Sequence, residues 1–217
     1  ALPGDLGPVP QGVSPPETSA GTTHFTIVDK AGNVVSMTTT VESGFGSFHM
    51  TRGFILNNQL TDFSSVPTDA TTGLLIANRM QPGKRPRSSM APTLVFAKNA
   101  DGTRGDFVMG TGSPGGATII QYVTKTLVGA LDWGLDAQQA TNLIDFGAAN
   151  TPTTNVGGEH PNLLKTSTGA VDPNDPLVAG LRALGHTVNT NAQSSGISTI
   201  IRVNTANGLR LQGGADP

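Results

Sequence analysis

A glycine-rich run at residues 110–116, Gly-Thr-Gly-Ser-Pro-Gly-Gly, lies between a predicted strand and the most regular helical pattern in the sequence. The strand is expected over residues 106–109, and apolar residues at helical spacing predict the helix over residues 117–131. Glycines at a helix start expose backbone N–H groups that can hold an anion or a developing oxyanion. A tight turn without a ligand is the simpler alternative, and this motif alone leaves both open.

Three other glycine motifs fit the run less well. It satisfies G-x-G-x-x-G, which is typical of dinucleotide-binding folds, but Pro114 stands inside the turn and no further βαβ unit follows. It lacks the lysine of a P-loop, and Thr111 stands where a nucleophile elbow around Ser113 requires glycine. A dinucleotide-binding oxidoreductase remains the alternative from a different class of enzyme.

Strands, then helices, then strands are predicted along the chain, which indicates a layered α+β domain. Two shorter helices are expected over residues 136–143 and 176–184, and a long surface loop over residues 61–88. The remaining strands are expected at residues 23–29, 34–41, 53–56, 92–98, 186–189, 198–203 and 209–212. A short hairpin-type turn at residues 30–33 joins the first two of these.

The composition excludes several classes of partner. Charged residues make up 13% and the formal net charge is −2, so we predict no nucleic-acid-binding surface. Cysteine is absent, which excludes disulfides and cysteine-type zinc sites, and we predict no metal and no cofactor. No apolar run approaches the roughly 20 residues of a membrane span.

Residues 1–21 contain five prolines and four glycines without a periodic pattern, which predicts a linker or the tail of a cut propeptide. A single catalytic domain is expected over residues 22–217. Because the chain does not begin with methionine, we expect it to be a piece of a longer gene product whose missing part lies N-terminal.

A Thr-Thr-His run, Thr22 to His24, opens the first predicted strand. A threonine hydroxyl is a poor nucleophile unless a base lies beside it, and its own α-amine can be that base only if the bond to Gly21 is cut. The alternatives are an ordinary strand start and, for His24, a packed or hydrogen-bonded histidine.

Two further clusters carry polar side chains suited to a substrate. One is a polar cluster just after a predicted strand, where turn chemistry is the alternative to a substrate contact, and its members are Asn57, Asn58, Gln59 and Asp62. Ser88 and Ser89 stand beside a basic rim at residues 84–87, and hydroxyls near cations suit a carboxylate.

Together these motifs resemble the small subunit of the γ-glutamyltranspeptidase family, within the N-terminal-nucleophile hydrolases. The matching segments, in chain order, are residues 22–25, 29–30, 32–33, 38–40, 45–47, 56–59, 62–64, 84–86, 88–90, 92–93 and 112–116. The resemblance implies a proenzyme that cuts itself before Thr22 into large and small subunits that stay together. It also implies an αββα sandwich, completed by a large subunit that is not in this chain.

The resemblance assigns roles by position. Thr22 is the expected nucleophile with its freed α-amine as base, Gly21–Thr22 is the processing site, and Thr40 supports the nucleophile by hydrogen bonding. The other expected roles are the oxyanion hole for Gly115 and Gly116, the substrate α-carboxylate for Ser88 and Ser89, and the α-ammonium for Glu42, Gln59 and Asp62. The expected donor is a γ-glutamyl compound such as glutathione, the acceptor is water, an amino acid or a peptide, and the expected compartment is the periplasm or the exterior.

Two features depart from the family pattern. Glu42 stands where transpeptidases usually carry asparagine, and the loop at residues 63–87 has no aromatic residue beyond Phe63 to form a lid. Both also suit a glutaryl- or cephalosporin-type acylase with the same nucleophile, which is the nearest alternative. A non-catalytic paralogue or an unprocessed precursor is the third.

Overall fold

The computed structural model of the protein describes residues 21–148, 151–206 and 208–216. The chain divides into two compact units. The first comprises Gly21 and residues 41–88, and the second comprises residues 22–40 and the described residues from 89 onward. Apart from Gly21, the linker predicted for residues 1–21 lies outside the described residues.

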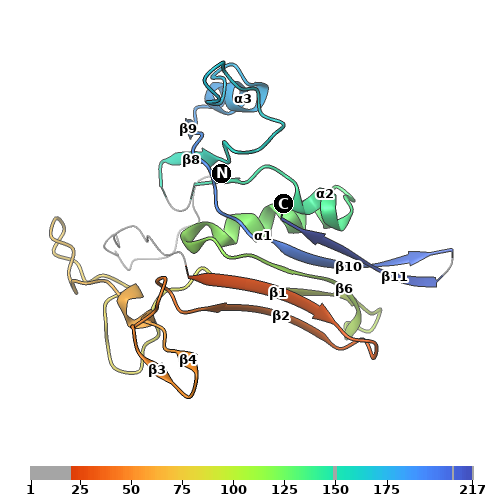
Figure 1. The fold of residues 1–217 in the computed structure, drawn as a ribbon, viewed down its shortest axis with the longest axis horizontal. Coiled ribbons are helices and arrows are strands. Elements are labelled where there is room, and N and C mark those ends of the chain that lie inside the picture. The colour runs from red at the N-terminus through yellow and green to blue at the C-terminus, as the bar shows by residue number, and fades with distance from the viewer. Residues whose placement is uncertain (1–20, 149–150, 207, 217) are drawn as a thin grey trace. The chain divides into compact units, whose positions relative to one another are not determined.

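The second unit contains two antiparallel sheets (Figure 1). Strands β1 (Thr22–Val28) and β2 (Val34–Thr40) form a hairpin in which Thr22 pairs with Thr40. The second sheet has the order β11-β10-β6-β5, and its strands are β5 (Thr93–Lys98), β6 (Arg104–Gly112), β10 (Ser198–Thr205) and β11 (Gly208–Ala215). These strands follow the predicted ones, with boundaries that differ by a few residues.

The hairpin packs on the four-stranded sheet through its polar face. The Thr26 hydroxyl donates to the Ser198 carbonyl at 3.4 Å, and the Ser36 hydroxyl donates to the Thr111 carbonyl at 3.1 Å. Alternate residues of a strand point to opposite faces, so the apolar residues between these positions face away from the sheet.

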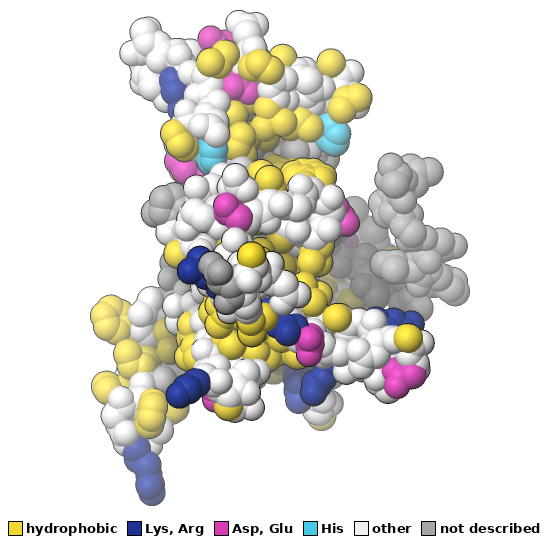
Figure 2. Space-filling view, turned by 90° about the vertical axis from the view of Figure 1, so that its right-hand side faces the viewer, with side chains coloured by type: hydrophobic (Ala, Val, Ile, Leu, Met, Phe, Trp, Pro, Cys, Tyr) yellow, Lys and Arg dark blue, Asp and Glu magenta, His cyan; other side chains and the backbone are white. Residues whose placement is uncertain are grey.

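That outer face of the hairpin is apolar and open to solvent. Phe25 lies opposite Met37, and Ile27 lies opposite Val35. These four side chains are between 36% and 53% exposed. The space-filling view in Figure 2 shows further hydrophobic side chains at the molecular surface.

Two helices contact the four-stranded sheet on the face away from the hairpin (Figure 1). The longer one, α1 (Ile119–Leu131), buries Ile119, Tyr122 and Val123 on one side, and burial of each such side chain stabilises the fold by about 1.5–3 kcal/mol. Because residues 116–118 form a 3-10 turn, α1 begins two residues later than predicted. Helix α2 (Ala137–Thr141) begins at the predicted N-cap, Asp136, which forms a capping box with Gln139.

A small three-stranded sheet completes the second unit. It contains β7 (Phe146–Gly147), β8 (Thr153–Val156) and β9 (Thr187–Asn189), and only β9 was predicted. Helix α3 (Pro176–Ala183) lies just before β9 in the chain, and Asp175 caps its first turn. No helix in the described part of the chain is long and apolar enough to cross a membrane.

The first unit is mostly irregular. The single strand predicted over residues 53–56 is instead the second half of a tight hairpin, β3 (Met50–Thr51) and β4 (Phe54–Ile55), which turns at Arg52 and Gly53 with positive φ. The 3-10 helix η1 (Gln59–Asp62) follows. The expected surface loop then contains only isolated bridges, Ser64 to Arg79 and Thr68 to Leu75.

Candidate active site

Thr22 and Thr40 lie opposite each other at the ends of β1 and β2. The Thr22 hydroxyl donates to the Thr40 hydroxyl oxygen at 3.0 Å, and both residues are half-buried. Directly paired residues project their side chains to the same face of a sheet, so the pairing itself brings the two hydroxyls together. A second hydroxyl therefore fixes the orientation of the Thr22 side chain.

His24, two residues further along the same face of β1, is a buried histidine at 8% exposure. Its Nδ1 lies 2.8 Å from the Thr38 hydroxyl and its Nε2 lies 3.1 Å from the Thr26 hydroxyl. Burial lowers the pKa of His24 to about 4, because the charged ring would lose its hydration. The ring is therefore neutral near pH 7, with both nitrogens occupied.

The glycine run begins beside this histidine. A Cβ added to Gly112, the last residue of β6, would lie 2.2 Å from Cε1 of His24, so only glycine fits there. The run then turns through Gly115 and Gly116, which have φ values of 134° and 57° and precede α1. Among the described residues, the amide N–H groups of these two glycines have no hydrogen-bond acceptor.

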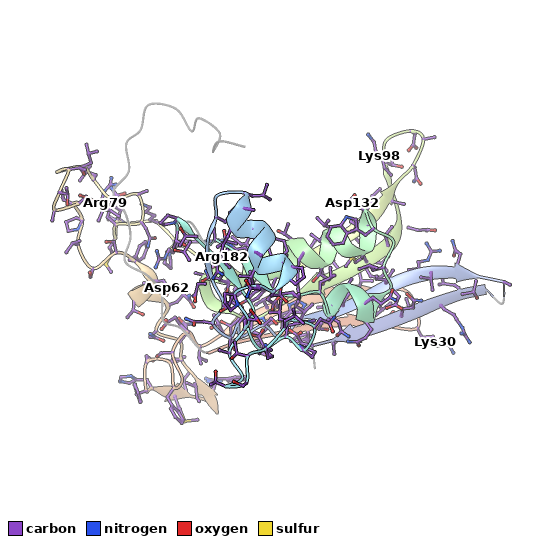
Figure 3. The ribbon with its side chains drawn as sticks, turned by 90° about the horizontal axis from the view of Figure 1, so that it is seen from above. Lys30, Asp62, Arg79, Lys98, Asp132 and Arg182 are labelled. Carbon is purple, nitrogen blue, oxygen red and sulfur yellow. The ribbon has the colours of Figure 1, made fainter. Side chains whose placement is uncertain are left out.

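The remaining predicted polar residues lie in the first unit, except Ser89. Glu42 has a positive φ of 73°, and its Oε2 accepts a hydrogen bond from the Asn58 side chain. In η1 the Gln59 side-chain amide donates to Oδ2 of Asp62, which is labelled in Figure 3. Asp62 is buried, which raises the pKa of its carboxyl, and the negative charge of Glu42 raises that pKa further.

Sequence reasoning placed Asn58 in a polar cluster without giving it a role. In the structure its side-chain oxygen accepts from both the backbone N–H and the hydroxyl of Ser43, at 3.0 and 3.1 Å. Since its Nδ2 also holds Glu42, Asn58 fixes both the backbone after Glu42 and the carboxylate itself. The consecutive asparagines at 57 and 58 were the only sequence signal for this.

Gly21 has a steric reason to be glycine. A Cβ at this position would lie 2.4 Å from the Glu42 carbonyl oxygen. The Gly21 carbonyl also accepts from the Val41 N–H at 3.3 Å. Close approach of two backbones therefore requires the missing side chain.

Ser88 and Ser89 fall on either side of the division between the two units. Both lie in an irregular segment, where Ser88 is exposed and Ser89 is half-buried. The backbone N–H of Arg87 donates to the Asn78 side chain at 2.9 Å, which holds the end of the first unit in place.

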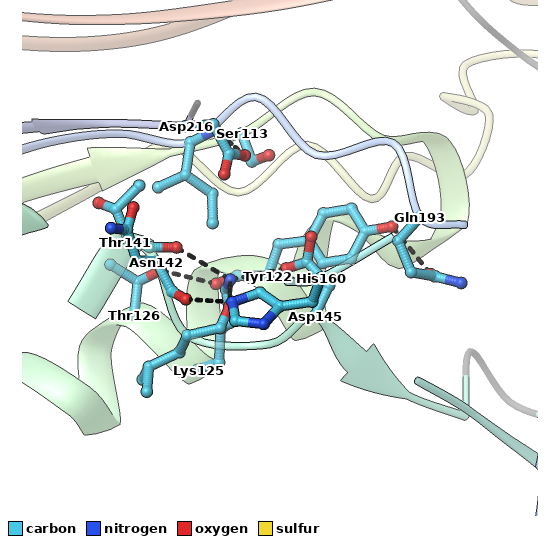
Figure 4. Close-up of polar contacts among 12 residues, drawn as sticks. Ser113, Tyr122, Lys125, Thr126, Thr141, Asn142, Asp145, His160, Gln193 and Asp216 are labelled. Carbon is cyan, nitrogen blue, oxygen red and sulfur yellow. Dashed lines mark hydrogen bonds and ion pairs between the residues drawn. The ribbon is translucent and has the colours of Figure 1, made fainter. Parts of the chain in front are cut away.

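A separate buried polar cluster lies under α1 (Figure 4). Nζ of Lys125 lies 2.8 Å from Oδ1 of Asp145 and donates to the Thr141 carbonyl at 3.0 Å. The pair lines a cavity of about 480 Å³ that contains none of the residues assigned to the active site. Among the described residues, no group of three or more His, Cys, Asp or Glu side chains is arranged to hold a metal.

Known proteins match both the sequence and the fold. The sequence profile of the family described as gamma-glutamyltranspeptidase matches residues 8–217. A glutathione hydrolase proenzyme from Bacillus subtilis subsp. natto is 35% identical over 193 residues, which are 86% of this chain and 28% of that protein. The chain thus spans less than a third of the length of this relative.

Solved structures agree with that match. The Helicobacter pylori gamma-glutamyltranspeptidase T380A mutant superimposes with a TM-score of 0.70 at 26% identity, covering 90% of this chain and 98% of that one. A cephalosporin acylase from Bacillus halodurans superimposes with a TM-score of 0.66 at 22% identity, covering 89% of this chain and 32% of that one, and this likeness shows the fold alone. The predicted α+β class and the predicted family are confirmed, and the chain belongs to the gamma-glutamyltranspeptidase family.

Proposed function

We propose that this chain carries the catalytic threonine of an autoprocessing enzyme that transfers or hydrolyses γ-glutamyl groups. The observation that carries the proposal is the hydrogen bond from Thr22 to Thr40 at the start of β1. Two residues further along the same strand, His24 lies against Gly112 of the glycine run. Thr22 is the residue that has both an oriented hydroxyl and, once the preceding bond is cut, a free α-amine to act as base.

Processing and turnover use the same hydroxyl. In the precursor, Oγ1 of Thr22 attacks the Gly21 carbonyl carbon, the acyl group moves from nitrogen to oxygen, and water hydrolyses the ester to free the α-amine. In turnover, Oγ1 attacks the γ-carbonyl carbon of the donor while the α-amine takes the hydroxyl proton. That proton then passes to the leaving amine, and water or an amino compound cleaves the acyl-enzyme.

The oxyanion of each tetrahedral intermediate needs fixed donors. The N–H groups of Gly115 and Gly116, which have no acceptor in the described part of the chain and lie just before α1, suit this role. Removing one such donor typically costs about 10²–10³ in rate.

Glu42, Gln59 and Asp62 are suited to the α-ammonium group of the donor, since two carboxylates and an amide oxygen accept from a cation. The proposed partners for the donor α-carboxylate are the hydroxyls of Ser88 and Ser89. The name of the Bacillus relative, glutathione hydrolase proenzyme, supports glutathione as one donor.

A large subunit from the same precursor completes the fold in this proposal. The second unit has a helical layer, a four-stranded sheet and a two-stranded hairpin whose outer face is apolar. Strands that extend the hairpin and helices that cover Phe25, Ile27, Val35 and Met37 would give the αββα sandwich. The short length relative to the proenzyme relatives supports this.

The direct test replaces Thr22 in the full-length precursor. Thr22→Ala should stop both processing, measured by intact mass, and release of aniline from a γ-glutamyl anilide. Thr23→Ala is the matched control, because Thr23 is exposed on the opposite face of the same strand. Turnover by Thr22→Ala at the wild-type rate would disprove the proposed nucleophile.

A substitution at Glu42 distinguishes the proposed γ-glutamyl activity from the acylase alternative. If its carboxylate binds an α-ammonium group, Glu42→Gln should raise KM for a γ-glutamyl anilide and leave the glutaryl anilide, which lacks that group, unaffected. A wild-type enzyme that prefers the glutaryl anilide would instead favour the acylase.

A further inference from the structure

The glycine turn at residues 113–116 is held from behind by a tyrosine and by the irregular segment at residues 193–197, here called the strap. Tyr122 lies on the buried side of α1 at 2% exposure. Its hydroxyl donates to the side-chain oxygen of Gln193 at 3.0 Å (Figure 4). The tyrosine thereby joins the first turns of α1 to the strap.

The Tyr122 ring lies directly against Gly115. A Cβ on Gly115 would lie 2.5 Å from Cε2 of the ring and 3.1 Å from the Ser194 carbonyl oxygen. Gly115 is thus enclosed between a rigid ring and a strap carbonyl. A glycine with φ of 134° has many other conformations available in open space, and this enclosure removes them.

The strap holds the turn at a second point. The Gly196 N–H donates to the Ser113 hydroxyl oxygen at 3.2 Å, and Ser113 is fully buried. Gly196 also packs against Pro114, since a Cβ there would lie 2.6 Å from Cγ of the proline. The residues on both sides of Pro114, Ser113 and Gly115, are therefore held in place, and these contacts fix the turn that precedes Gly116.

The strap is itself anchored at both ends. The Gln193 N–H donates to a carboxylate oxygen of Glu159 at 2.9 Å, and the Ile197 N–H donates to Oδ2 of Asp216 at 2.9 Å. Burial raises the pKa of the Tyr122 hydroxyl, so it stays protonated and remains a donor near neutral pH. A turn clamped in this way can present its N–H groups without reorganising during the reaction.

We propose that Tyr122 is a positioning residue, which acts with the strap to fix the Gly115 and Gly116 N–H groups where the oxyanion forms. This inference rests on the proposed acyl-transfer function. A purely structural role for Tyr122 would lower the stability of the fold but leave the rate per folded molecule unchanged. A positioning role changes kcat more than KM.

The test compares two replacements of Tyr122 in the full-length enzyme. Tyr122→Phe keeps the ring against Gly115 and loses the bond to Gln193, and we expect kcat for a γ-glutamyl anilide to fall about 10-fold. Tyr122→Leu loses the ring as well, and we expect its kcat to fall about 100-fold. In both variants KM should stay within about twofold of the wild-type value.

Thr141→Val is the matched control, because it removes a fully buried hydroxyl in α2 that donates to the Ala137 carbonyl. It should lower the melting temperature about as much as Tyr122→Phe while kcat stays at the wild-type value. If both tyrosine variants keep the kcat of this control, the positioning role is refuted.

Hydrogen exchange of the peptide containing residues 113–118 gives a readout that does not depend on activity. Faster exchange in Tyr122→Leu than in Thr141→Val supports the clamp, and equal exchange refutes it. A wild-type enzyme that turns over no γ-glutamyl anilide would overturn the proposed function, while the exchange comparison would still decide whether Tyr122 holds the turn.

Discussion

The hydroxyl of Thr22 donates to the hydroxyl oxygen of Thr40 at 3.0 Å across the first and last residues of an antiparallel hairpin. Thr40→Val keeps the shape of the side chain and removes this acceptor. A hydrogen bond worth about 1 kcal/mol corresponds to a loss of about fivefold in rate, so kcat and the rate of self-cleavage should each fall by about that factor.

Thr39→Val is the control for this prediction, because Thr39 is the neighbouring residue and is exposed on the other face of β2. Stopped-flow turnover and time-resolved intact mass measure the two rates. Equal rates in the two variants would show that the Thr40 hydroxyl does not assist Thr22.

Gly21→Ala should slow self-cleavage. The added Cβ would lie 2.4 Å from the Glu42 carbonyl oxygen, and crowding of this kind costs about 1–3 kcal/mol. If the crowding raises the activation free energy of self-cleavage by this amount, the rate of self-cleavage drops roughly 5- to 150-fold. Gly44→Ala in the same unit is the control, since no atom lies within 4 Å of its Cβ position, and unchanged processing in both variants would contradict the prediction.

His24 should make the fold less stable in mild acid. Its folded-state pKa of about 4 lies below the unfolded value of 6.5, so protons bind the unfolded chain more tightly. The stability is complete above pH 6.5 and decreases as the pH falls toward 4, by about 2 kcal/mol at pH 5. Thermal unfolding of the full-length protein measures this decrease.

Two variants, each lacking one histidine, test whether His24 is the source of this decrease in stability. His24→Asn should reduce the decrease between pH 7.5 and pH 5, whereas His49→Asn should retain it, because His49 is exposed. An identical pH dependence in His24→Asn and the wild type would rule out His24 as its source.

Removing one partner of the Lys125–Asp145 ion pair should destabilise the fold strongly, whereas replacing both partners with apolar residues should destabilise it much less. Both side chains are almost fully buried, so Asp145→Asn leaves an uncompensated ammonium group and should destabilise the fold by about 3–5 kcal/mol. Lys125→Met combined with Asp145→Leu removes both charges and should recover most of that loss. Chemical denaturation measures both, and a double variant no more stable than Asp145→Asn would contradict the prediction.

Segments with a periodic pattern or a clear N-cap were predictable from the sequence, whereas strands β7 and β8 were not. Helical spacing located α1, and the turn after Asp29 located the hairpin that sets Thr22 opposite Thr40. Strands β7 and β8 have only two and four residues, too few for a periodic pattern to stand out.

The long-range contacts of the site were also beyond sequence patterns. The bond from Asn58 to Glu42 joins residues 16 positions apart, and Glu42 has a positive φ, which is uncommon for a residue with a side chain. The approach of Gly115 to the Ser194 carbonyl joins residues about 80 positions apart, and the strap has no regular structure. Local propensity carries no information about either contact.

The open apolar face of the β1–β2 hairpin bears on the order in which such an enzyme can mature. A two-stranded hairpin is only marginally stable by itself, and an exposed apolar surface favours association with copies of itself. A chain starting at Thr22 and synthesised separately would meet water with Phe25, Ile27, Val35 and Met37 uncovered. In the proposed maturation, folding as one polypeptide first and cutting second would avoid that aggregation-prone stage, so that late cleavage would protect solubility as well as supply the catalytic amine.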